Sequence, residues 1–144
     1  MIRKFSIPLA GLIVGLAVPA HAADDAFAAG ALAYEKAVKS TSRPSKQSDF
    51  AYCSGYWDVW SNAANDGTIS QAGLAALPVD LRPPSTSFAA MAMIMMLEDA
   101  DTVEQQIEPS QKEARQLVAA SLAGNVEAAQ SLFHSLGICQ LDDE

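Results

Sequence analysis

The chain has 144 residues, of which 50% are hydrophobic, and it carries 17 acidic against 9 basic side chains, for a formal net charge of −8 at pH 7. A negative surface repels nucleic acid and anionic membranes, so we expect neither as a partner, and it favours cationic partners. The length is sufficient for one domain with a buried core.

The N-terminus has the three parts of a secretory signal peptide. Two basic residues precede an apolar stretch from Ile7 to Pro19, and Ala20-His21-Ala22 places small residues at the first and third positions before a cut. The stretch is shorter than the roughly 20 residues of a transmembrane anchor, so we favour cleavage after Ala22 over an uncleaved anchor. Residues 1–22 are then the signal peptide, and residues 23–144 form a single periplasmic or secreted domain with a net charge near −10.

Nearly every segment after the signal peptide predicts helix, because no stretch shows sustained alternation of apolar and polar residues. The first helix is expected from residue 24 or 25 to about residue 40. The second is expected from about Ser48, as its N-cap, to Asn65, with Gly67 as a C-terminal cap. Apolar residues three or four apart form one stripe on this second helix, which should occupy the centre of the core. The stripe consists of Phe50, Cys53, Trp57, Trp60 and Ala64.

The middle of the chain predicts a short helix over residues 69–77, followed by an extended connection through the prolines at 78, 83 and 84. A third long helix should begin near residue 85. We expect it to end by Glu108, because Pro109 restricts the residue that precedes it.

The C-terminal part predicts two more helices. Ser110-Gln111-Lys112-Glu113 has the pattern of a capping box and predicts the start of a separate fourth helix. Gly124 breaks that helix, Asn125 caps a fifth, and Gly137 should close the fifth. Together the elements predict an all-α bundle of four to six helices.

Two cysteines, Cys53 and Cys139, predict one disulfide, because an oxidising compartment and an even cysteine count favour a bridge. The bond would tie the end of the last helix to the aromatic second helix.

One side of the third predicted helix is acidic. Carboxylates spaced three, three and four residues apart share this face, where they could bind a basic partner or a hard cation, or could simply be a solvated surface. They are Glu98, Asp101, Glu104 and Glu108.

Methionines are concentrated between residues 91 and 96, within ten residues that carry no polar side chain. Met91 and Met95 share a helix face, and thioethers are soft ligands suited to Cu(I), so copper handling is one hypothesis. The alternatives are that the methionines fill an irregular core or line an adaptable apolar groove.

Catalytic motifs are not found. His134 is the only histidine after the signal peptide, and no nucleophile motif accompanies it, so we interpret it as a surface residue. The Asn65–Ser70 segment is similar to the middle of an EF-hand loop, but alanine and glycine stand where ligands are needed, so a helix cap and turn explain it. The layout of an exported helical domain ending in a cysteine resembles the four-helix c-type cytochromes, yet no Cys-x-x-Cys-His is present to attach haem. We expect no cofactor.

The profile is small, acidic, exported and without a catalytic motif. It favours a non-enzymatic helical protein that binds another protein or a peptide in the cell envelope, as chaperones, inhibitors and immunity proteins do. The alternative is periplasmic Cu(I) handling through the methionines.

Overall fold

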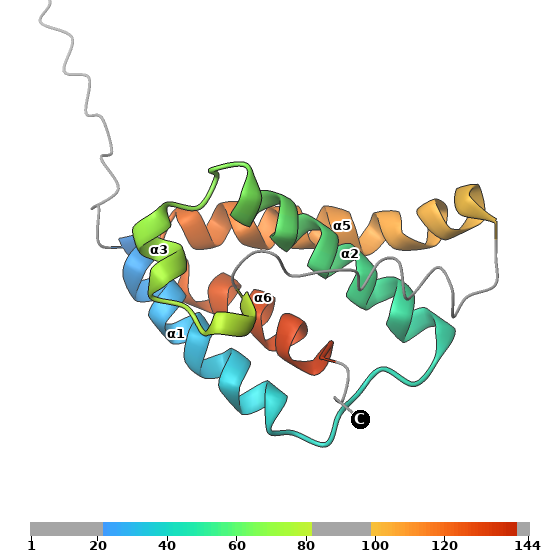
Figure 1. Ribbon diagram of the computed structural model, residues 1–144, viewed down its shortest axis with the longest axis horizontal. Helices are drawn as coiled ribbons and strands as arrows, with labels where there is room; N and C mark the ends of the chain where they lie inside the picture. The colour runs from blue at the N-terminus through green and yellow to red at the C-terminus, as the bar shows by residue number, and fades with distance from the viewer. Residues whose placement is uncertain (1–21, 82–98, 141–144) are drawn as a thin grey trace, which may run out of the picture.

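The computed structural model describes residues 22–81 and 99–140, and these residues form helices and connections without a β-strand (Figure 1). The predicted all-α fold is confirmed. The elements are α1 (Ala22–Val38), α2 (Gln47–Asn65), α3 (Gln71–Ala75), the 3₁₀ turn η1 (Val79–Leu81), α5 (Ala100–Leu122) and α6 (Val126–Ile138).

The long helices among the described residues, α1, α2, α5 and α6, form two parallel pairs. Gly30 of α1 lies beside Phe133 of α6, and Ala37 lies beside Gly137, so α1 and α6 run in the same direction. Ala51 of α2 clusters with Ile107 of α5, and further along both helices Ala63 lines one hollow together with Val118, so this pair is parallel too. Figure 1 shows the α2 and α5 pair running against the α1 and α6 pair.

The α1 and α6 helices cross closely because glycines lie at the contact. A Cβ on Gly137 would come 2.7 Å from the Cβ of Ala37 and 2.8 Å from the carbonyl oxygen of Tyr34. Gly137 was expected to close α6, and this is wrong: the helix continues to Ile138, and Cys139 is its C-cap. The glycine is there because no larger residue fits against α1.

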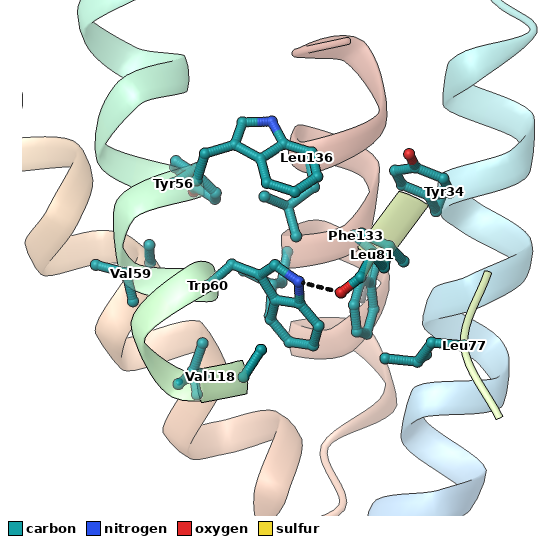
Figure 2. Close-up of a cluster of buried hydrophobic side chains, with 14 of the residues drawn as sticks. Tyr34, Tyr56, Val59, Trp60, Leu77, Leu81, Val118, Phe133 and Leu136 are labelled. Carbon is teal, nitrogen blue, oxygen red and sulfur yellow. Dashed lines mark hydrogen bonds between the residues drawn. The ribbon is translucent and has the colours of Figure 1, made fainter. Parts of the chain in front are cut away.

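Aromatic residues of three helices meet in the core. The ring of Trp60 lies 5.1 Å from that of Phe133 and 6.5 Å from that of Phe27, both in edge-to-face arrangements that favour aromatic packing. The Trp60 indole N–H donates to the carbonyl oxygen of Leu81 at 2.9 Å (Figure 2). This bond satisfies the one polar group of a fully buried tryptophan and fixes η1 over α2.

The predicted disulfide is confirmed. Cys53 of α2 is bonded to Cys139 at the end of α6, with a Cα–Cα distance of 5.3 Å, and both residues are buried. The stripe expected on α2 is also confirmed in the core at Cys53, Trp57, Trp60 and Ala64. Phe50 is only partly buried and packs instead on a small second cluster with Val103 and Ile107.

A single helix, α5, contains Pro109, so the predicted division into helices ending at Glu108 and starting at Ser110 is wrong. Proline removes the N–H that would bond the Gln105 carbonyl, but Gln105 and Pro109 are both exposed, and water can hydrate that carbonyl. Val103 and Ile107 before the proline pack on α2, and so do residues after it. Burial of the two apolar side chains contributes roughly 3–6 kcal/mol, enough to offset a proline penalty of about 3 kcal/mol.

Several helix ends differ from the predictions. Lys46, not Ser48, is the N-cap of α2, because the Asp49 carboxylate accepts hydrogen bonds from the backbone N–H groups of Ser45 and Lys46 at 3.1 and 3.0 Å. These bonds hold the pKa of Asp49 below its usual 3.8. The short helix expected over 69–77 covers only α3, with Ser70 as its N-cap, and residues 79–81 form η1 rather than an extended chain.

Other predicted ends are confirmed. The Asn125 side chain accepts from the Ala128 N–H at 3.0 Å and caps α6. Gly67 follows α2 with a φ of 85°, a left-handed conformation that glycine adopts without strain. The segment expected to be helical between residues 85 and 98 lies outside the described residues. The predicted continuation of that helix through residue 99 is wrong, because Asp99 has an extended backbone and is the N-cap of α5.

Candidate functional site

The acidic side of α5 begins just after its N-cap. The Asp99 carboxylate accepts hydrogen bonds from the backbone N–H of Thr102 at 3.0 Å and from its hydroxyl at 2.8 Å. These bonds lower the pKa of Asp99, so it is ionised at neutral pH, next to the positive end of the helix dipole. The cap fixes where α5 starts, and the burial of Val103 and Ile107 in a cluster with Ala51 of α2 determines that the acidic residues face away from that contact.

Asp101, Glu104 and Glu108 form what we call the acidic row. All three are exposed, and their spacing places them on one side of α5. Within residues 22–81 and 99–140 their carboxylates make neither a hydrogen bond nor an ion pair. Glu98, the fourth residue of the predicted cluster, lies outside the described residues. The row is thus a negatively charged surface that this part of the fold does not neutralise.

The row borders a hollow with a volume of about 460 Å³. Beyond the row, its walls are the side chains of Gln105, Gln111 and Arg115. The Gln111 amide donates to the Asp58 carboxylate of α2 at 2.9 Å, so this wall is tied to the neighbouring helix.

A second hollow, of about 360 Å³, lies between α2 and the C-terminal half of α5. We call it the α2/α5 groove. Its apolar lining comes from both helices, and small residues keep it open where larger side chains would fill it. The apolar residues are Val59, Ala63, Val118, Ala119 and Leu122, and the polar ones are Asp58, Asn62, Asp66, Thr68 and Arg115.

The two hollows are neighbours, and Arg115 lines both. The residues that α5 contributes to them fall within roughly 140° of its circumference at 3.6 residues per turn. We call this combined surface the α2/α5 strip. It carries the acidic row at one end, the groove at the other and Arg115 between them.

The strip depends on the close approach of α2 and α5. A Cβ on Gly55 would lie 2.8 Å from the backbone nitrogen of Gln111, so only glycine permits this crossing. The Ser110 hydroxyl donates to the Ile107 carbonyl at 2.8 Å, with the Ala51 carbonyl of α2 at 3.3 Å. Ser110 is therefore buried at a helix contact and is not the helix cap that the sequence suggested.

Other residues considered from the sequence do not join this surface. His134 is exposed on α6, as expected, and Trp57 and Trp60 lie in the core. The EF-hand-like segment forms the end of α2 and a turn in which the Asp66 carboxylate accepts from the hydroxyl and the N–H of Thr68. Those bonds lower the pKa of Asp66.

The described ranges contain no candidate metal site. In them, no group of three or more histidine, cysteine, aspartate or glutamate side chains lies close enough together to hold an ion. Met91 and Met95 lie outside the described residues, so the copper hypothesis stays a prediction of the sequence.

Sequence reasoning found the acidic row but missed the groove. The signal was present, because Arg115, Val118, Ala119 and Leu122 continue the same helix side as the row. It was hidden by the predicted helix break at Pro109, which placed the two halves on separate helices.

No family model, curated protein or solved structure matches this chain significantly. None of the helices in residues 22–81 and 99–140 is both long and apolar enough to cross a bilayer.

Proposed function

We propose that this protein is an exported helical protein without catalytic activity, which binds a basic protein or peptide through the acidic row of α5. The observation that carries the proposal is the row itself. Like charges three and four residues apart on a helix repel one another, and the hollow that these three carboxylates line has one cation, Arg115, among its described residues, so the net charge there is negative. A cationic partner would relieve that repulsion and gain charge-assisted contacts.

Export is supported by the pattern of the first 22 residues and by the disulfide. A buried bond between cysteines 86 residues apart suits an oxidising compartment. Intact mass and N-terminal sequencing of the protein from an envelope fraction test this part. Cleavage after Ala22 gives a chain that starts at Ala23, and a chain that still starts at Met1 would contradict it.

Binding is tested by capture from an envelope extract with a matched pair of variants. The row variant carries Asp101→Asn, Glu104→Gln and Glu108→Gln. The control removes the same charge from exposed carboxylates elsewhere through Glu35→Gln, Glu113→Gln and Glu127→Gln.

We expect the row variant to retain about tenfold less partner at moderate salt, because three exposed charge pairs contribute roughly 0.2–1 kcal/mol each. The control should retain as much as the unmodified protein. If both variants lost the same amount of partner, net charge alone would explain the binding. If neither variant lost partner, the row would not take part in binding.

A further inference from the structure

The α2/α5 strip joins two chemistries on one surface. The row is anionic, whereas the groove is lined by aliphatic side chains of α2 and α5. We propose that the strip holds one cationic amphipathic helix of the partner, with apolar side chains in the groove and lysine or arginine side chains over the row. This inference rests on the proposed function and specifies the chemistry of its partner.

The groove sets what the apolar side of the partner must be. Its volume of about 360 Å³ is near the lower end of the range of about 300–1,000 Å³ found for ligand sites, so it accommodates a few side chains. Val59, Ala63 and Val118 form a buried floor that offers no polar group, and an aliphatic or aromatic anchor therefore fits it.

Charge sets the polar side of the partner. Asp58 and Asp66 line the groove, and the three carboxylates of the row line the other hollow. Arg115 is the single cation among the residues that line the strip. An anionic helix would meet carboxylates at both ends of the strip, whereas a cationic helix is complementary to both ends.

Length and backbone chemistry favour a helix over an extended peptide. Glu104 and Val118 are 14 residues apart on α5, which is about 21 Å at 1.5 Å per residue. A helix of similar residue number covers that span. An extended peptide would need hydrogen bonds for its backbone, and the described chain offers no strand edge, while a helix satisfies its own backbone groups.

The test uses a synthetic probe of 16 residues with leucine on one helix side and lysine on the other, and a scrambled peptide of equal composition. Fluorescence anisotropy measures binding, and circular dichroism measures helix formation on mixing. Ala119→Trp fills the groove from an exposed position, and Gln130→Trp adds the same side chain to an exposed position of α6 as a control. Urea unfolding of each variant verifies that it is folded, and Ala119→Leu replaces the tryptophan variant if that one is not.

We expect the amphipathic probe to bind and gain helicity. Ala119→Trp should weaken binding by about tenfold or more, because burial of one apolar anchor is lost, and Gln130→Trp should leave it unchanged. Equal binding of the scrambled peptide, or equal binding by Ala119→Trp, would overturn this inference, while the capture experiment with the row variant would still decide the proposed function. Dimers of the protein alone that Ala119→Trp abolishes would assign the strip to a second copy and also overturn it.

Discussion

Replacing Gly55 with alanine tests the crossing of α2 and α5, on which the strip depends. The new methyl carbon would lie 2.8 Å from the backbone nitrogen of Gln111 and 2.9 Å from the Cβ of Ser110, and closer still to the Ser110 hydroxyl oxygen. Carbon atoms in favourable contact are about 3.5–4.0 Å apart. Rotation of the serine can move its oxygen, but the backbone nitrogen moves only if α5 moves.

Two effects of opposite sign determine the free energy of unfolding. Alanine is preferred over glycine in a helix interior by about 0.5–1 kcal/mol. Overpacking a tight contact costs about 1–3 kcal/mol. Because the contact involves rigid backbone as well as a side chain, the steric cost should exceed the helix preference, and we expect Gly55→Ala to destabilise the protein by about 1–2 kcal/mol.

Urea unfolding followed by circular dichroism measures this difference. Asn62 is exposed on the same helix, so the difference between Asn62→Gly and Asn62→Ala measures the preference for alanine without the close contact. Adding Ser110→Ala to Gly55→Ala should recover only part of the loss, because the contacts with the serine Cβ and the Gln111 nitrogen remain. A Gly55→Ala protein at least as stable as the unmodified one would refute the geometry of this crossing.

Two further predictions concern the disulfide and acid stability. The double change Cys53→Ala and Cys139→Ala should lower the free energy of unfolding by about 4–5 kcal/mol, which is the chain-entropy value for an 86-residue loop. Urea unfolding measures this difference, and a loss below about 1 kcal/mol would contradict the prediction. Hydrogen bonds lower the folded-state pKa of Asp49, Asp66 and Asp99 below the ordinary 3.8, so their stabilisation is complete above that pH and is lost as pH falls through the lower folded values. Urea unfolding between pH 5 and about 2.5 should show this decline in the free energy of unfolding. Asp99→Asn keeps a good N-cap and should make the decline with falling pH shallower. An unchanged slope would mean that Asp99 does not contribute to the pH dependence.

The parts of the fold that the sequence predicted are those where local chemistry and burial agree. Cys53, Trp57 and Trp60 recur at helical spacing on a stripe that is apolar throughout, so the central helix was identifiable, and Asn125 caps α6 with a bond to its own first turn. The disulfide followed from compartment and cysteine count. Nothing in these inferences required knowledge of which helices are neighbours.

The parts that were missed depend on contacts between helices. Gly137 has the local pattern of a helix end, but its small size is required by Tyr34 and Ala37 of α1. Ser110 has the pattern of a cap, but its hydroxyl is buried against α2. Half of the candidate site was missed for the same reason, because the groove exists only where two helices distant in sequence run side by side.

Pro109 is the residue at which tertiary packing most clearly overrides local preference, and its replacement by alanine measures by how much. Alanine restores the backbone N–H and removes the ring, and in a helix interior this change stabilises the folded protein by up to about 3 kcal/mol. The unfolded chain gains conformational freedom, which reduces the benefit by about 0.4–1 kcal/mol. Because Pro109 is exposed and no packing is lost, Pro109→Ala should raise the free energy of unfolding in urea by about 1–2.5 kcal/mol. A destabilised variant would mean that the proline geometry itself holds Ile107 and Ser110 against α2, and that packing alone does not explain the continuous helix.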